Sequence, residues 1–271
     1  MGIEQYGRSY KLTVAPVDGG EGITIKDLRV SFRVEKTSTS EPNKATIQVY
    51  NLSSLSRGRI ETKTQAVVLD AGWVDLSQRI FAGVISRVEH RKEPPDIITE
   101  IECKDGRDLS AAAFRRSYRK GTSKRRIVND VIAAMANTST GPMTASALAG
   151  NAGGRVVLSG KSRQVLDRLA RSWGFEWSVQ DGAIQIIDET STSKPKTEAI
   201  ILRKDTGMIG SPAKTNRGCK VKALLQPGLN PGVYVQVVST FLSGYFKVES
   251  VEHAGDTHGG DWSSNVEARR I

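Results

Sequence analysis

The sequence predicts a mainly β protein, α+β overall, in which two β-barrel regions lie on either side of a small α+β insert. Apolar and polar residues alternate through the first hundred residues, which is typical of strands with one face in a core. Between residues 124 and 173 the apolar spacing changes to that of helices, and alternation returns after residue 218. We therefore expect three domains, at residues 1–105, 106–190 and 191–271.

Residues 1–105 are expected to hold several short strands and one small helix. The expected strands cover residues 28–34, 45–49, 66–71, 79–89 and 97–103. Asn51 to Ser56 ends the second of these strands and offers caps for a short helix that runs to about Ile60. Glu93-Pro94-Pro95-Asp96 turns the chain between the last two strands. This arrangement favours a compact β-barrel.

The middle of the chain predicts two amphipathic helices followed by a hairpin. The two apolar stripes are Ile127, Val128, Val131, Ile132, Met135 and Ala136, and then Val165, Leu166, Leu169, Ala170 and Trp173. Ser162 is the expected cap of the second helix, and Gly174 is placed to end it. Asp181-Gly182 between two apolar runs is the strongest hairpin signal in the sequence.

The C-terminal region predicts a second all-β unit, separated from the insert by a polar linker at residues 189–196. Three alternating runs start at Val221, Val233 and Tyr245, and Gly, Pro, Asn and Ser clusters lie between them. This pattern is typical of a β-meander, in which consecutive strands are neighbours.

The last turn of this region gathers residues that suit metal ions. His253, Asp256, His258 and Asp261 lie in a glycine-rich segment, and imidazole and carboxylate groups bind several divalent ions. A metal-dependent hydrolase at His253 to Asp261 is therefore one alternative function. The spacing fits no metal motif, however, and Asp-Thr and Gly-Gly-Asp are ordinary turn formers. We expect a turn between strands, with no catalytic residue, metal or cofactor.

Other candidate catalytic residues have simpler structural interpretations. Gly160-Lys161-Ser162 resembles the end of a P-loop, but the first glycine of that motif is replaced by Arg155. His90 lies among charged residues at the end of an expected strand, where a solvated position is expected. Cys103 follows alternating apolar residues, so a small core residue is expected. We expect no enzymatic activity.

Composition and charge limit the remaining classes. The chain has 271 residues, of which 38% are hydrophobic and 25% charged, so a buried core is expected. No apolar run spans a membrane, the N-terminus lacks the apolar stretch of a secretory signal, and no membrane partner is expected. Two distant cysteines, Cys103 and Cys219, exclude a disulfide scaffold and favour a reducing cytoplasm as the place of synthesis.

The net charge of +10 is unevenly distributed and permits an acidic partner. Arg115 to Arg126 contains seven basic residues and no acidic one, with Tyr118 between them. A nucleic-acid-binding module that uses this stretch is a second alternative function. Lys124, Arg125 and Arg126 are expected in the first turn of a helix, where the macrodipole disfavours cations. An acidic protein surface is the favoured partner, and stable nucleic-acid binding is not expected.

Three segments of the sequence resemble the baseplate hub proteins of contractile-tailed phages, a family related to the base of the type VI secretion spike. The segments are Ala45 to Ser53, Ser162 to Gly182 with its Trp173-Gly174-Phe175 and Asp181-Gly182, and Leu225 to Trp262 with Gly244 to Val248 and His253 to Thr257. The resemblance implies two tail-tube-like β-barrels, with the α+β insert of two helices and a hairpin between them.

The resemblance also implies a structural role without catalysis. Three chains with two barrels each would form a ring of pseudo-sixfold symmetry that joins the hexameric tail tube to the trimeric spike. The implied partners are two further copies of the chain, the tail tube protein, the central spike protein and other baseplate proteins. The implied location is the virion, in the tail baseplate, after assembly in the cytoplasm of the bacterial host. The chain is short for such a hub and shows no lysozyme-like segment.

Overall fold

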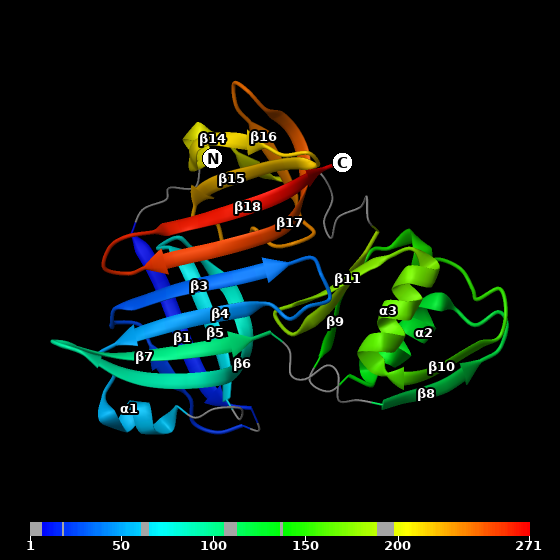
Figure 1. Cartoon of the computed structure of the whole chain (residues 1–271), viewed down its shortest axis with the longest axis horizontal. Coiled ribbons are helices and arrows are strands. Elements are labelled where there is room, and N and C mark those ends of the chain that lie inside the picture. Colours follow the sequence, from blue (N-terminus) through cyan, green and yellow to red (C-terminus); the bar gives the residue numbers. More distant parts are fainter. Residues whose placement is uncertain (1–6, 18, 61–64, 106–112, 136–137, 189–197) are drawn as a thin grey trace.

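The computed structural model describes residues 7–17, 19–60, 65–105, 113–135, 138–188 and 198–271. Two β-rich parts, at the N- and C-terminal ends of the sequence, lie together, and the α+β insert lies beside them (Figure 1). The mainly β class with an α+β insert is confirmed. No helix among these residues is long and apolar enough to cross a membrane.

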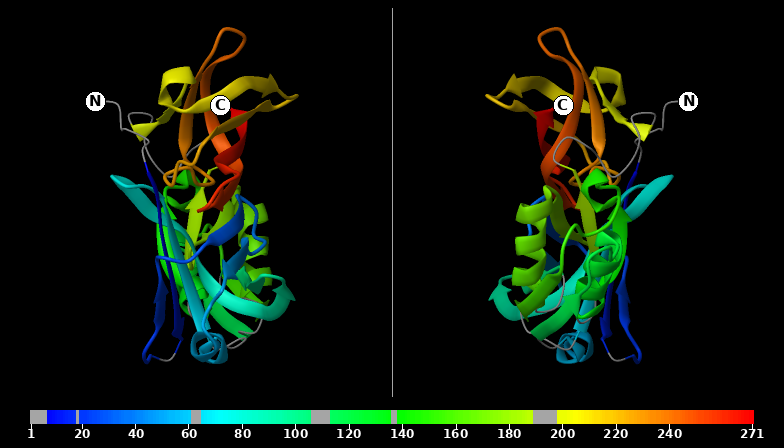
Figure 2. Two further views of the ribbon diagram at one scale, coloured as in Figure 1. Left: turned by 90° about the vertical axis from the view of Figure 1, so that its left-hand side faces the viewer. Right: turned by 90° about the vertical axis from the view of Figure 1, so that its right-hand side faces the viewer.

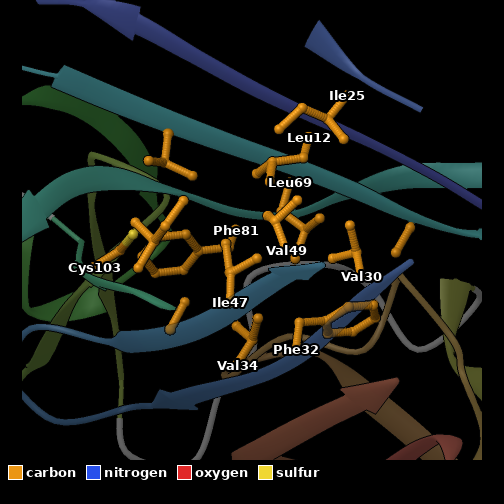
Figure 3. Close-up of a cluster of buried hydrophobic side chains, with 14 of the residues drawn as sticks. Leu12, Ile25, Val30, Phe32, Val34, Ile47, Val49, Leu69, Phe81 and Cys103 are labelled. Atoms are coloured by element: carbon orange, nitrogen blue, oxygen red, sulfur yellow. The ribbon is translucent and has the colours of Figure 1, made fainter. Parts of the chain in front are cut away.

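The N-terminal part is a strongly curved antiparallel sheet with one short helix. Its elements are β1 (Arg8–Pro16), β2 (Ile23–Ile25), β3 (Val30–Thr37), β4 (Lys44–Tyr50), α1 (Ser54–Arg59), β5 (Gln65–Trp73), β6 (Leu76–Glu93) and β7 (Asp96–Lys104). The strand order is β3-β4-β7-β6-β5-β1-β2. Because the sheet folds over, Leu12 and Leu69 from one end lie across the core from Val34 and Ile47 (Figure 3). The predicted strands and the helix capped by Ser53 are confirmed.

The C-terminal part has its own core, but its strand order differs from the predicted meander. Its elements are β13 (Ile200–Leu202), η3 (Lys204–Thr206), β14 (Met208–Lys214), β15 (Gly218–Leu224), β16 (Tyr234–Val238), β17 (Ser243–Asp256) and β18 (Trp262–Arg270). β15 pairs with β14 and β18, and β16 pairs with β13 and β17. The predicted pairing of the first two strands of the meander, β15 and β16, was wrong. Leu225 and Leu229 are buried, so the loop between these strands enters the core instead of making a tight hairpin.

One sheet connects the two β-rich parts. Residues Ser250 to Asp256 of β17 pair antiparallel with Ser31 to Thr37 of β3, and thirteen strands of the described chain therefore share a sheet. Two tryptophans strengthen this connection: the Trp73 indole donates to the Leu225 carbonyl at 2.8 Å, and that of Trp262 donates to the Gly72 carbonyl at 3.0 Å. The two expected barrel regions are thus two cores under a shared sheet.

The insert is built from two small sheets and two helices around a third core. Its elements are β8 (Ala113–Tyr118), α2 (Lys124–Ala133), β9 (Ser139–Met143), η1 (Ser146–Leu148), β10 (Val156–Lys161), α3 (Ser162–Trp173), β11 (Glu176–Gln180) and β12 (Ala183–Ile187). β8 pairs with β10, and β12 lies between β11 and β9. The apolar stripes of both helices are buried in this core as predicted, except that Trp173 is only partly buried against it and Ala136 lies outside the described residues.

The helix and hairpin boundaries of the insert test three predictions. Gly174 ends α3 with φ 76°, as expected of a left-handed cap. Asp181 and Gly182 form the turn of the β11–β12 hairpin, with φ of 54° and 82°. The prediction for Ser162 was wrong: Lys161 occupies the cap position, and Ser162 is the first residue of α3 and is fully buried. The linker at residues 189–196 lies outside the described residues.

Candidate assembly surfaces

A polar face extends across seven neighbouring strands of the shared sheet, and we call it the polar sheet face. It consists of outward-pointing residues of β15, β18, β17, β3, β4, β7 and β6. They are Lys220, Lys222, Asn265, Glu267, Ser250, Glu252, Asp256, Ser31, Arg33, Glu35, Lys44, Thr46, Gln48, Glu100, Glu102, Lys104, Arg87 and Glu89. None of them is buried, whereas the opposite side of the same strands covers the cores.

Cross-strand ion pairs hold the side chains of this face in place. The Arg33 guanidinium lies 2.8 Å from the Glu252 carboxylate, which also accepts from Asn265. Arg87 lies 3.5 Å from Glu102 on the neighbouring strand β7, and it also pairs with Glu89 of its own strand at 2.6 Å. Partners directly or diagonally opposite on neighbouring strands stabilise a sheet in this way. The face therefore stays ordered while it remains in contact with water.

The polar sheet face is almost neutral. It contains six basic and seven acidic residues, although the whole chain carries +10. The excess positive charge of the chain therefore lies on other surfaces. Over β14, β15, β18, β17 and β3 the face is hollowed into an open groove of about 640 Å³, and its lining includes Glu35, Lys222 and Glu267.

Three strands leave an edge without a neighbour in the described sheet. β14 and β2 are the two ends of the main strand path, and β13 ends the branch that starts at β16. An exposed strand edge presents backbone N–H and C=O groups that can pair with another chain. β14 is the longest of the three, and a register shift between Ile209 and Ala213 bends it.

A buried polar joint connects the hairpin of the insert to the N-terminal part. The Asp105 carboxylate accepts the backbone N–H of Asp181 and of Gly182, each at 2.6 Å. Asn43 donates to the Val179 carbonyl at 2.8 Å, and the Gln180 amide donates to the Thr37 carbonyl at 2.8 Å. The tip of the β11–β12 hairpin is thereby fixed to the N-terminal part by its own backbone.

Lys36 supplies the positive charge of this joint. Its side chain is completely buried, and its ammonium donates to the Asp181 carboxylate at 2.7 Å and to the Asn230 side chain at 2.9 Å. Asp181 also accepts from the backbone of Ala82. Burial and the nearby Asp181 charge raise the pKa of Asp105 to about 6, against the lowering effect of Lys36 and the two N–H groups. One lysine thus holds together residues from all three parts of the chain.

The open end of the same hairpin is fixed to the C-terminal part by a second buried lysine. The Lys247 ammonium donates to the Glu176 carboxylate at 2.8 Å and to the Asp188 carbonyl at 2.9 Å. Arg269 pairs with the same Glu176 at 3.5 Å. Burial lowers the pKa of Lys247, and the Glu176 hydrogen bond opposes that shift. The β11–β12 hairpin therefore bridges the N- and C-terminal parts.

His253 has a structural position in the interior. It is fully buried, and its Nε2 donates to the Leu229 carbonyl at 3.1 Å because a carbonyl can only accept. Its Nδ1 accepts from the Ser264 hydroxyl at 2.8 Å, and Ser264 accepts the Gln226 N–H. Burial and the Lys36 charge lower the pKa of His253 to about 3, so the ring is neutral. The imidazole fixes the loop that follows β15.

The other residues of the candidate metal site are directed to different partners. Asp256 pairs with Arg29 at 2.8 Å and accepts the His258 N–H, and Asp261 lies 3.4 Å from Lys222. The Arg29 hydrogen bond helps to lower the pKa of Asp256 against the opposing effect of burial. The described residues contain no group of three or more His, Cys, Asp or Glu side chains that could hold a metal ion. The predicted turn was wrong for His253 and Asp256, which lie on β17 because they pair with β3, and the turn to β18 starts only after Asp256.

The basic stretch is divided between a strand and a helix. Arg115 and Arg116 are exposed on β8, and Arg116 pairs with Asp130 at 3.0 Å. Lys124 and Arg125 lie in the first turn of α2 as predicted and donate to the carbonyls of Ala147 and Met143. Carbonyl contacts therefore offset part of the unfavourable position of these cations at a helix N-terminus.

The remaining candidates have the structural roles that we expected. His90 is exposed and lies 3.1 Å from the Thr99 hydroxyl. Cys103 is buried in the N-terminal core, and burial raises the pKa of its thiol to about 12. Gly160 and Lys161 end β10, which leads directly into α3.

Sequence reasoning missed the two buried lysines and Asp105. A signal for Lys36 was present, because it continues the inward alternation of Val30, Phe32 and Val34 on β3. A lysine at such a position is buried only when it has a partner. Its partner, Asp181, is distant in sequence, and nothing in the spacing of the residues indicates that pairing.

Similar folds occur in solved tail proteins. The tail protein from Neisseria meningitidis MC58 is 11% identical, with a TM-score of 0.68 over 98% of this chain and 97% of that one. The 43 kDa tail protein of prophage MuSo2 from Shewanella oneidensis is 12% identical, with a TM-score of 0.65 and 97% and 98% coverage.

A type VI secretion protein also shares the fold. The E. coli c3393 protein, described as a component of that system and structurally similar to the T4 phage tail proteins gp27 and gp5, is 12% identical. Its TM-score is 0.58 over 90% of this chain and 73% of that one. No curated protein sequence matches the chain.

The family model of baseplate hub gp41 matches residues 11–253. The chain belongs to this family and is a structural protein of the phage tail. The predicted resemblance to baseplate hub proteins is confirmed.

Proposed function

We propose that this chain is a non-enzymatic hub subunit that assembles as a trimer in the tail baseplate. The trimer forms a ring of pseudo-sixfold symmetry that joins the hexameric tail tube to the trimeric spike. The observation that supports this proposal best is the shared sheet: each chain places two β-rich cores side by side under one continuous sheet. Three such chains supply six cores, which matches a hexameric neighbour on one side and a trimeric one on the other.

In this proposal the ring closes through the free strand edges. A head-to-tail contact generates a ring when its rotation closes, and it needs two different surfaces on each chain. β14 and β2, at opposite ends of the strand path, are two such surfaces. Pairing between copies converts edges that would otherwise favour aggregation into a defined interface.

The proposed location is the virion, after assembly in the host cytoplasm, with the tail tube protein, the central spike protein and other baseplate proteins as partners. The structural roles of His253, Asp256 and Asp261 support the absence of catalysis, since each of them has a partner within the fold. The ordered polar sheet face remains available to line a water-filled surface of the ring.

Light scattering coupled to size-exclusion chromatography tests this function. The purified chain is measured alone, with the tail tube protein and with the spike protein of the same phage. We expect particles of three times the monomer mass of 29.4 kDa, either alone or on a partner, and ring-shaped images in electron microscopy. A monomer that associates with neither partner at micromolar concentration would contradict the proposal.

A further inference from the structure

Most of the net positive charge of the chain lies in the insert. Residues 113–188 contain twelve basic and five acidic residues, so they carry seven of the ten net positive charges. Residues 1–105 are balanced, with fifteen charged residues of each sign, and residues 198–271 contain nine basic and seven acidic residues. A charge concentrated in one part of a protein attracts oppositely charged partners to that part.

The acidic residues of the insert are all engaged within the fold. They are Asp130, Asp167, Glu176, Asp181 and Asp188, and each side chain has a hydrogen-bond or ion-pair partner in the same chain. Glu176 and Asp181 are directed toward the other two parts, where they bind the two buried lysines. The solvent-facing side of the insert is therefore more basic than its net charge indicates.

The outward side of the two-stranded β8–β10 ribbon carries cations, and we call it the basic ribbon face. It consists of Ala113, Arg115, Ser117, Val157, Ser159 and Lys161, with Arg119 and Lys120 after β8 and Arg155 before β10. All of these residues are exposed, whereas the opposite side of the ribbon packs on the core of the insert. The insert forms one end of the long axis of the molecule (Figure 1), and the right-hand view of Figure 2 faces this end.

The cations of the basic ribbon face lack carboxylate partners. Among the described residues, no ion pair involves Arg115, Arg119, Lys120, Arg155 or Lys161. On the polar sheet face, by contrast, Arg33 and Arg87 have carboxylate partners on neighbouring strands. Cations gathered on one face repel one another, and an anionic partner relieves that repulsion.

Two positively charged hollows flank the ribbon. The hollow beside β8, of about 340 Å³, has Arg115, Arg116 and Asp130 in its lining. The hollow beside β10, of about 330 Å³, has Arg168, Arg171 and Asp167 in its lining. Guanidinium groups bind carboxylates through strong charge-assisted hydrogen bonds. Acidic side chains of a partner therefore have a place on both sides of the ribbon.

The other features of this face fit a protein partner better than a nucleic acid. Val157 lies opposite Ser117 among the cations and is 68% exposed. Protein interfaces cover such apolar side chains, whereas nucleic acids offer basic surfaces mainly phosphate and sugar. Single-stranded nucleic acids also stack on exposed aromatic rings. The rings of the described insert are buried or partly buried, namely Phe114, Tyr118, Trp173, Phe175 and Trp177.

We propose that the basic ribbon face is a docking surface for an acidic protein surface on another component of the tail. Arg115 and Lys161 contact carboxylates of the partner, and Val157 is covered in the middle of the contact. A second copy of this chain lacks the complementary charge, because neither of its other two parts is net negative. The inference rests on the proposed function, since it places other tail proteins beside this chain.

Carbodiimide cross-linking of purified tails of the phage that encodes the chain tests this contact directly. The reagent joins a lysine amine to a carboxylate that already touches it, and mass spectrometry identifies the linked residues. We expect Lys120 or Lys161 to be joined to an Asp or Glu of a different tail protein. Links from these lysines only to a second copy, or no link from either, would overturn the inference.

Titration of the cross-linked partner, purified alone, measures how much the cations contribute. We expect Arg115→Glu/Lys161→Glu to weaken its binding to the full-length chain by about tenfold or more at low salt, because like charges across an interface repel. The difference should shrink as salt is added. The matched control, Lys92→Glu/Lys204→Glu, changes the net charge equally at two exposed lysines outside the insert and should leave the affinity unchanged.

The remaining outcomes separate this inference from the hub function. Equal affinity of the original chain and Arg115→Glu/Lys161→Glu would overturn the docking surface. Tighter binding of a DNA duplex than of the partner, lost in the same variant, would overturn it in favour of nucleic acid. Each of these results leaves the hub function standing. Absence of the chain from the purified tails would overturn both.

Discussion

The polar sheet face and the buried polar joint each contain an ion pair from β3. Arg33 points outward and pairs with Glu252, and the two side chains are 61% and 28% exposed. Lys36 points inward and pairs with Asp181, with 0% and 22% exposure. Exposed pairs add little stability because water screens them, whereas a buried charge without its partner is strongly destabilising.

The exposed and the buried ion pairs of this sheet have different structural roles. The outward charges keep a broad surface hydrated and ordered without determining whether the chain folds. The inward charges determine where the insert sits, because the hairpin that carries Asp181 can satisfy Lys36 in one position. The outward charges therefore act on the hydrated surface, and the inward charges act on the arrangement of the parts.

The largest expected effect comes from removing the buried cation. Lys36→Ala leaves Asp181 and Asp105 close together without their shared positive charge, and we expect a loss of about 3–5 kcal/mol in the free energy of unfolding. Urea unfolding followed by circular dichroism measures this loss. Lys36→Met combined with Asp181→Asn should recover part of it, because asparagine tolerates the left-handed backbone at that position. A loss no greater than that of Arg33→Ala would remove the distinction between the two networks.

The next effect is pH-dependent and tests the buried side of β17. The pKa of His253 is about 3 when folded and about 6.5 when unfolded, so its contribution to stability is complete above pH 6.5 and is lost as the pH falls toward 3. This contribution should decrease by about 2 kcal/mol between pH 7 and pH 5. His253→Gln, which cannot be protonated, should therefore show a flatter pH dependence in urea unfolding. An unchanged slope in the variant would mean that the imidazole remains accessible to protons.

The titration of Asp105 should change the free energy of unfolding in the opposite direction. Its folded pKa of about 6 lies above its ordinary value of 3.8, so its contribution is complete below pH 3.8 and is lost as the pH rises through 6. Between pH 7 and pH 5 the original chain should gain about 1 kcal/mol from this group. In Asp105→Asn that gain is absent, and stability should fall more steeply on acidification than in the original chain. Parallel pH profiles would contradict the burial of this carboxylate.

The residue pattern predicts elements more reliably than their partners. Alternation such as Val30, Phe32 and Val34 identified the strands, and Asp181-Gly182 identified the hairpin, because strand periodicity and turn conformation are local properties. The pairing of β15 with β18 and of Lys36 with Asp181 depends on contacts between distant residues, which local spacing does not encode. For the same reason, the sequence predicted His253 in a glycine-rich turn, whereas it lies on β17 and holds the loop that contains Leu229.

The smallest expected effect is on the polar sheet face itself. Arg33→Ala removes an exposed ion pair, and we expect a loss of about 0.2–1 kcal/mol in the free energy of unfolding at low salt. The loss should shrink further in 0.5 M salt, where the Debye length falls to a few ångströms, whereas the effect of Lys36→Ala should persist. Salt-dependent urea unfolding of both variants provides the measurement. A loss above about 2 kcal/mol for Arg33→Ala would show that the outward network also determines the fold, because an exposed pair does not contribute that much.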